Sequence, residues 1–131
     1  CLTSILMAQE VVKAPEFDRS RFSERYICIG IDDKNTVYEL DFFLDNSQDL
    51  AAVWQGAGQY YFKGNGFAIS PNQFVFHFIS QDPREPIAGM QYYNKVDDHS
   101  LVGHWHAWIT EGVDGPIERI NGHETCLKVS S

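Results

Sequence analysis

Short segments that favour β-structure follow one another along most of the chain, and the turns between them constrain the fold more than any other feature. From residue 25 onward the segments are separated by two to six residues rich in Gly, Pro, Asn and Asp. Connections this short join antiparallel neighbours, because parallel pairing needs much longer crossovers. We expect an antiparallel, largely up-and-down sheet. The segments are 25–31, 36–45, 50–62, 67–70, 73–80, 87–95, 100–109, 116–120 and 123–129.

Two of these turns contain the dipeptide Asn-Gly, which favours tight hairpins because both residues tolerate positive φ. One is Asn65-Gly66, within 63–66, and the other is Asn121-Gly122. Two prolines in 81–86 cannot donate to a β ladder, so that stretch should form a longer connection. The chain is expected to reverse direction at each of these places.

Closure of the sheet follows from the number of its strands. A meander of about eight or nine strands has two exposed edges unless its first and last strands pair. With 131 residues the chain is long enough for one domain with a core and too short for two. We predict one all-β domain over 1–131, a closed antiparallel up-and-down barrel with a short amino-terminal helix. The alternatives are an α+β fold, in which a curved sheet wraps around that helix, and a two-sheet sandwich.

Residues 1–20 are expected to form that helix and a linker. The apolar residues of this segment lie roughly on one helical stripe that would cover the core, and Pro15 should end the helix. The same apolar start also fits the tail of a targeting segment or a lipidated Cys1, although it lacks a basic beginning. The stripe consists of Leu2, Ile5, Leu6, Gln9 and Val12.

The charge balance limits the classes of partner. The chain has 10 basic and 18 acidic residues, a net charge of −8 and a pI near 4.9. Nucleic acids and anionic membranes require a basic surface, so neither is an expected partner. No apolar run approaches the roughly 18 residues that a membrane span needs. We expect a soluble acidic domain; the sequence does not decide between a secreted, periplasmic or cytoplasmic setting.

Alternation along the later strands indicates that both faces of the sheet are covered. In 73–80, three phenylalanines on one face alternate with Val75, His77 and Ile79 on the other. Neither face of 100–109 is hydrophilic either, and strands that are apolar on both faces are covered on both. One face should meet the core and the other a ligand, a helix or another subunit, which leaves a homo-oligomer open.

Histidines and aromatic residues on these strands predict a binding cavity. The stretch GHWHAW (103–108) places His104 and His106 side by side on one face. A mostly apolar cavity with a few polar anchors is typical of a small-molecule site, and neutral histidine can both donate and accept. We predict that the chain binds a small, largely apolar molecule in a barrel cavity with His, Tyr and Gln side chains as polar anchors and with no cofactor required. The glutamines in question are Gln55, Gln59 and Gln91. The predicted lining residues are Tyr61, His77, Tyr93, His104, His106 and Trp108.

Three other functions fit the same residues. Imidazole titrates near neutral pH, so His104 and His106 would be the catalytic acid and base of a cyclase, isomerase or dehydratase. Alternatively, His77, His104, His106 and Glu111 would hold a transition metal such as zinc, copper or iron. A protein-interaction or inhibitor module, with the histidines on an outer face, is the third alternative.

The cysteines Cys28 and Cys126 fall in the first and the last strong strand. If the barrel closes, these strands become neighbours, and a disulfide between the two residues has reasonable geometry. Two buried thiols are the alternative, and the sequence does not decide between them.

The segment GHETCLKV (122–129) resembles the closing strand of the avidin family, in which Gly-His-Asp-Thr precedes a Lys-Val end. This resemblance implies a calycin-like barrel, of the avidin and lipocalin type, that holds a small ligand. It also implies that Glu124 takes the place of the acidic residue that contacts the ureido group of the ligand. The spacing of His104, His106 and Glu111 is similar to the first metal motif of the cupins, which implies a metal site.

Overall fold

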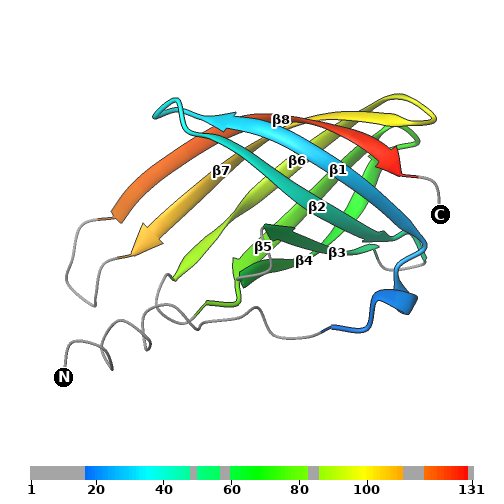
Figure 1. The fold of residues 1–131 in the computed structure, drawn as a ribbon, viewed down its shortest axis with the longest axis horizontal. Coiled ribbons are helices and arrows are strands. Elements are labelled where there is room, and N and C mark those ends of the chain that lie inside the picture. Colours follow the sequence, from blue (N-terminus) through cyan, green and yellow to red (C-terminus); the bar gives the residue numbers. More distant parts are fainter. Residues whose placement is uncertain (1–16, 48–49, 57–59, 83–85, 111–116, 130–131) are drawn as a thin grey trace, which may run out of the picture.

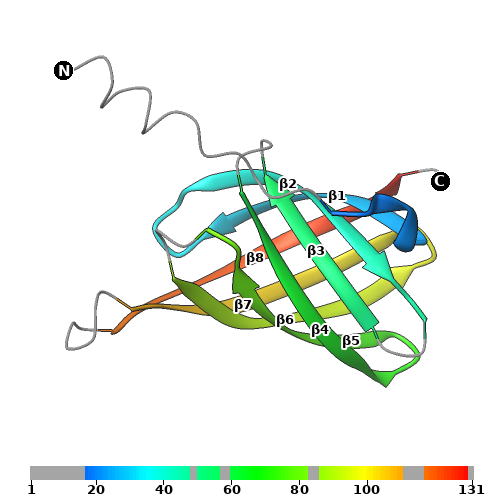
Figure 2. The ribbon, with the colours of Figure 1, turned by 90° about the horizontal axis from the view of Figure 1, so that it is seen from below.

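The computed structural model describes residues 17–47, 50–56, 60–82, 86–110 and 117–129. Within these ranges eight antiparallel strands form one closed barrel, in which neighbours in sequence pair and β1 also pairs with β8. Strands β8 and β1 lie on one side of the barrel, and β3 and β4 lie on the opposite side (Figures 1 and 2). The strands are β1 (Glu24–Asp32), β2 (Val37–Asp45), β3 (Leu50–Gly56), β4 (Tyr60–Ser70), β5 (Gln73–Ser80), β6 (Ile87–Asp97), β7 (Ser100–Thr110) and β8 (Ile117–Val129).

The predicted all-β, closed, up-and-down barrel is confirmed. The helical structure of the described residues is one short 3-10 turn, η1 (Arg19–Arg21). The predicted amino-terminal helix falls mostly on residues 1–16, which lie outside the described residues. In the part of the chain that the structure describes, no helix is long and apolar enough to cross a membrane.

Both predicted Asn-Gly turns are wrong. Strand β4 runs through Asn65-Gly66 and β8 runs through Asn121-Gly122, which joins four predicted segments into two strands. The predicted segment 50–62 instead divides between β3 and β4, so the nine segments correspond to eight described strands. Glycine at these places makes room for large neighbours: a Cβ on Gly122 would lie 2.6 Å from the Trp105 ring, and one on Gly66 would lie 2.6 Å from the Phe76 ring. The requirement for space inside the barrel therefore outweighs the turn preference of the dipeptide.

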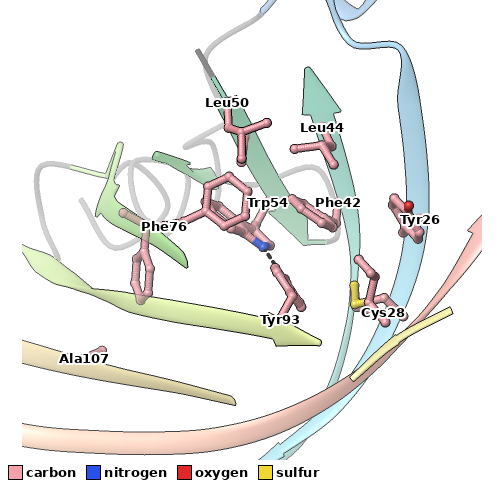
Figure 3. Close-up of a cluster of buried hydrophobic side chains, with 13 residues drawn as sticks. Tyr26, Cys28, Phe42, Leu44, Leu50, Trp54, Phe76, Tyr93 and Ala107 are labelled. Carbon is pink, nitrogen blue, oxygen red and sulfur yellow. Dashed lines mark hydrogen bonds between the residues drawn. A yellow bond between two sulfur atoms is a disulfide. The ribbon is translucent and has the colours of Figure 1, made fainter. Parts of the chain in front are cut away.

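Aromatic side chains fill much of the barrel interior. Phe42 stacks on Trp54, with ring centroids 5.3 Å apart, and on Tyr93 at 4.9 Å. Phe76 packs edge-on against all three rings. Figure 3 shows this cluster, with the disulfide beside it. Such rings bury large apolar areas and contribute most of the hydrophobic stabilisation of a small core.

A second buried cluster lies on the outside of the barrel. Phe43, Val53 and Tyr61 point outward from β2, β3 and β4, yet they are buried because Phe17 and Phe22 pack over them. Phe17 lies 5.2 Å from the Phe43 ring and 5.5 Å from the Tyr61 ring. The segment that precedes β1 therefore covers part of the outer face, as the apolar character of both strand faces requires.

A disulfide joins the first strand to the last. Cys28 and Cys126 are direct partners in the β1–β8 register, with Cα atoms 4.0 Å apart, and their sulfurs are bonded. The sequence left this pairing and two free thiols open. Both side chains are fully buried and point into the barrel, which fixes the inward face of each strand.

Candidate functional site

The barrel interior holds a cavity of about 440 Å³. It lies toward the β1–β2 turn, because Asp32 and Thr36 line it together with Gly56 at the end of β3 and Ile87 at the start of β6. Its volume is within the range of about 300–1,000 Å³ that is usual for small-molecule sites. Much of the wall is aromatic. The aromatic lining residues are Tyr38, Trp54, Phe62, Phe78 and Trp105.

The cavity reaches the surface beside the β1–β2 turn. Thr36 and Glu39 both line it and are exposed to solvent. The turn itself is fixed by Asp32, whose carboxylate accepts from the backbone N–H groups of Lys34 and Thr36 at 2.9 Å each. These bonds hold the β1–β2 side of the opening in place.

Glu124 is the one carboxylate of the cavity that is buried deep in the interior. It belongs to β8, and its side chain lies between two tyrosine hydroxyls. Tyr38 donates to Oε1 at 2.7 Å, and Tyr93 donates to Oε2 at 2.6 Å. Both oxygens of the carboxylate are therefore held by short, charge-assisted hydrogen bonds.

Two tryptophans complete this network. The indole Nε1 of Trp105 donates to the Tyr38 hydroxyl at 2.7 Å, and that of Trp54 donates to the Tyr93 hydroxyl at 2.7 Å (Figure 3 shows the second bond). Each tyrosine thus accepts from a tryptophan and donates to Glu124. The five residues come from five different strands, so closure of the barrel assembles the site.

The backbone around the network is shaped to admit its rings. A Cβ on Gly30 would overlap the hydroxyl end of Tyr38, and one on Gly122 would overlap the Trp105 indole. Glycine at both positions allows the rings to lie close against the wall. Tyr38 and Trp105 can therefore take their places in the network because Gly30 and Gly122 leave room for their rings.

Burial raises the pKa of Glu124, and the hydrogen bonds from Tyr93 and Tyr38 act in the opposite direction. Burial, followed by the adjacent negative charge of Glu124, raises the pKa of Tyr38 and of Tyr93. Both tyrosines therefore stay protonated and keep donating at neutral pH. The site is a buried carboxylate between two neutral donors.

The charge of the cavity is negative. Asp32, Glu39 and Glu124 line it, and its described lining contains no lysine, arginine or histidine. An anionic molecule would meet like charges without a compensating cation. A neutral molecule with an N–H or O–H donor, or a cation, matches this wall.

Gln91 adds a second polar group beside Glu124. It is buried on β6, and its Nε2 donates to the carbonyl of His104 at 3.2 Å and to that of Tyr92 at 3.3 Å. These bonds hold the amide in place against the cavity. Because its donor is used, the amide oxygen is the atom that a ligand would meet.

The structure separates the residues that the sequence predicted to share a site. Tyr93 points into the barrel and belongs to the Glu124 network. His77, His104, His106 and Trp108 are on the outer face and exposed, so the prediction that they line the cavity is wrong. On β7 the inward positions belong to Leu101, Gly103, Trp105 and Ala107, so alternation turns His104, His106 and Trp108 outward. On β5 the buried neighbours Phe76 and Phe78 turn His77 outward in the same way.

Tyr61 is a further predicted residue that does not line the cavity. Tyr61 is buried on the outer face beneath Phe17, because its strand neighbour Phe62 takes the inward position. Glu111 lies outside the described residues. His77 is separated from His106 by Met90 on the intervening strand β6, so the predicted histidine and glutamate metal set is not assembled by the described residues.

Most residues of this candidate site were not predicted from the sequence. Tyr38, Trp54 and Trp105 carry no motif, and Glu124 was implied through the avidin resemblance alone. Gln91 was predicted as one of the glutamine anchors, and it does line the cavity. A stronger signal was present in β8. If Cys126 points inward to meet Cys28, then Glu124, two residues earlier, points inward as well.

The buried sulfurs do not form a metal site as they stand. Cys28, Cys126 and Glu124 place their side-chain atoms within 4.8 Å of one another, and Cys126 Sγ lies 3.5 Å from Oε2 of Glu124. The two sulfurs are bonded to each other, however, so neither is a thiolate. Zinc and related metals bind the thiolate form of cysteine, so this group does not fit a metal while the disulfide is intact.

Comparison with known proteins shows a similarity of fold alone. No protein-family model matches the sequence, and no curated protein matches it. Among solved structures, a redesigned β-barrel is similar, with a TM-score of 0.67 and 9% sequence identity over 86% of this chain and 95% of that chain. At this identity the similarity supports the barrel architecture and says nothing of a ligand.

Proposed function

We propose that the chain binds a small, largely apolar ligand that carries an N–H or O–H donor, with that donor on Glu124. The observation that carries this proposal is a buried carboxylate at the side of an aromatic cavity whose described lining has no basic residue. The aromatic wall takes up the apolar body of the ligand, and Glu124 orients its polar end. A fatty acid or another anion is the wrong charge for this cavity.

The energetic weight of the polar contact sets the size of the expected effect. A hydrogen bond to a charged group contributes about 1.5–3 kcal/mol, which is roughly a 10–100-fold change in affinity. The rest of the affinity comes from burial of the apolar body against rings such as Trp54 and Trp105. Removing the charge of Glu124 should therefore weaken binding without abolishing it.

A calycin-like relationship is the finer part of this proposal. The eight-stranded antiparallel barrel supports it, as does the resemblance of 122–129 to the closing strand of the avidin family. In the avidin-like arrangement an acidic residue of that strand contacts the ligand, and Glu124 is inward-facing at the corresponding place. The ligand itself is proposed only by its chemistry.

A pair of fluorescent probes of equal ring size tests the proposal. We expect 1-aminoanthracene to bind saturably, because it is apolar and carries an amine donor, and 9-anthracenecarboxylate not to bind. Glu124→Gln should lower the affinity for the amine at least about tenfold. Asp98→Asn, which removes an exposed carboxylate from the β6–β7 turn, is the matched control and should change nothing.

Near-ultraviolet circular dichroism first establishes that Glu124→Gln keeps its packed aromatic core. The proposal is contradicted if the wild-type chain does not bind the amine saturably. It is equally contradicted if folded Glu124→Gln binds the amine as tightly as the wild type.

An acid–base enzyme is the second candidate, and one observation favours it. Glu124 is a buried carboxylate whose pKa is raised, next to the Tyr38 hydroxyl, and such groups serve as general bases. A cyclase, isomerase or dehydratase would use this pair in place of His104 and His106, which face away from the cavity.

Chromatography and mass spectrometry of the recovered ligand separate the two candidates. Turnover is indicated if the ligand recovered from the wild-type chain is chemically altered and the ligand recovered from Glu124→Gln is not. A ligand that leaves both unaltered indicates binding alone.

A further inference from the structure

Three histidines lie together on the outer face of β7 and β8, on the side of the sheet away from the cavity. His104 is the direct cross-strand partner of His123, and His106 follows His104 by two residues on the same face. The ring centroid of His104 lies 6.0 Å from that of His106 and 6.2 Å from that of His123. Figure 1 shows β7 and β8 side by side along this part of the barrel.

These distances are close to those of imidazoles that share one metal ion. Zinc binds histidine nitrogen at about 2.0–2.1 Å in tetrahedral geometry, which places the centroids of two bound rings about 5 Å apart. The His104 ring is therefore about 1 Å farther from each of the other two rings than in a zinc-bound pair. All three side chains are exposed, so their rings are free to rotate about the side-chain bonds toward a shared ion, and the proposed site requires that rotation.

Two features of the neighbouring residues bear on a metal site at these histidines. Tyr92 stacks on His104, with centroids 5.2 Å apart and planes at 21°. Asn121, the cross-strand partner of His106, donates to the carboxylate of Asp33 at 3.2 Å, which brings a negative charge to this edge of the group. A nearby carboxylate favours the approach of a cation.

We propose that His104, His106 and His123 bind one divalent transition metal ion, with zinc as the reference ion. Three neutral imidazoles are a donor set that suits zinc, copper and nickel, and they leave a further position for water or another ligand. The site differs from the set predicted from the sequence, since His123 takes the place of His77. It is independent of the proposed ligand cavity, which lies on the other face of the same strands.

Isothermal titration of the untagged, disulfide-bonded chain with zinc chloride tests the site. We expect one equivalent of zinc to bind. His104→Gln, His106→Gln and His123→Gln should each lower the affinity by at least the roughly 10–100-fold that loss of a supporting residue costs at metal sites.

The chain has five histidines, which provides a matched control. The double variant His77→Gln/His99→Gln leaves the three proposed ligands as the only histidines and should bind zinc like the wild type. Glu124→Gln should also bind zinc normally, because its carboxylate is inside the barrel.

Three results would overturn the proposal: no stoichiometric binding by the wild type, unchanged affinity in any one of the three single variants, or loss of binding in the His77/His99 control. Because the substituted side chains are exposed, circular dichroism should show every variant folded.

Discussion

Glu124 holds a carboxylate in the interior of the barrel, and its hydrogen-bond partners are two tyrosine hydroxyls rather than a cation. Burial disfavours its charged form, and the two hydrogen bonds offset part of that cost. Burial of such a group lowers the stability of the fold, whereas its carboxylate oxygens can each accept a further hydrogen bond from a ligand donor. The two consequences can be measured separately.

The stability of the chain should carry a pH signature of this residue. Because the pKa of Glu124 is raised above its ordinary value near 4.5, the folded state holds the proton more tightly than the unfolded state. This contribution is fully present below about pH 4.5 and is lost as the pH rises through the folded pKa. We expect the difference in free energy of unfolding between wild type and Glu124→Gln to shift toward the wild type on acidification.

Urea denaturation at several pH values between roughly 8 and 4.5 measures that difference. A difference that stays constant over this window, or one that shifts toward Glu124→Gln on acidification, would contradict the assignment of a raised pKa.

The glycines beside the network can be tested at the same scale. In Gly122→Ala the new Cβ would lie 2.6 Å from the Trp105 ring and 2.8 Å from the carbonyl of Ile31, so the indole that donates to Tyr38 must shift. We expect a loss of about 1–3 kcal/mol in the free energy of unfolding, as for other overpacked interiors. Gly56→Ala is the control, because its Cβ would meet only the Glu39 carbonyl at 3.8 Å. Equal losses in the two variants would contradict the steric explanation.

At the scale of the strands, the sequence predicts the barrel architecture better than it predicts which face of each strand points into the barrel. Short connections and alternating residues are enough to indicate a closed antiparallel barrel, because neither long crossovers nor long helices fit between the segments. The strand boundaries predicted at the Asn-Gly dipeptides are wrong, because Gly66 and Gly122 provide space within long strands. Turn preference is a local property, whereas the need for space depends on which ring lies across the barrel.

The choice of the inward face was the main limit on predicting the site. Both faces of β7 carry apolar residues, so alternation groups His104 with His106 correctly but does not say which row is inside. Polar histidines looked like anchors of a cavity, while the row of Gly103, Trp105 and Ala107 forms the wall. Only tertiary pairing, here between Cys28 and Cys126, settles the direction.

The disulfide should contribute strongly to the joint between β1 and β8. Its two cysteines are 98 residues apart in sequence, so it removes much conformational freedom from the unfolded chain. We expect Cys28→Ala/Cys126→Ala to lower the free energy of unfolding by about 2–5 kcal/mol. Urea denaturation of the variant and of the wild type, with and without a reducing agent, measures this loss. An unchanged midpoint in the variant and in the reduced wild type would contradict a structural disulfide.

For the whole molecule, the wall formed by β7 and β8 carries cavity-lining residues on its inner face and a group of histidines on its outer face. Strands β7 and β8 present Trp105 and Glu124 to the cavity, and they present His104, His106 and His123 to the outside. The opposite wall is covered from outside by Phe17 and Phe22. Aromatic rings fill part of the described interior and the cavity of about 440 Å³ takes another part, so the fold offers a ligand a place inside the barrel.

The three tryptophans of the chain allow the most direct test of the central claim, that the interior of the barrel binds the ligand. Trp54 and Trp105 line the cavity, whereas Trp108 is on the outer face. We would record ¹H–¹⁵N correlation spectra of the labelled chain during titration with 1-aminoanthracene and assign the indole signals with Trp→Phe variants. The indole N–H signals of Trp54 and Trp105 should shift together to saturation while that of Trp108 stays in place. A shift of Trp108 alone, or no indole shift at saturating probe, would contradict binding inside the barrel.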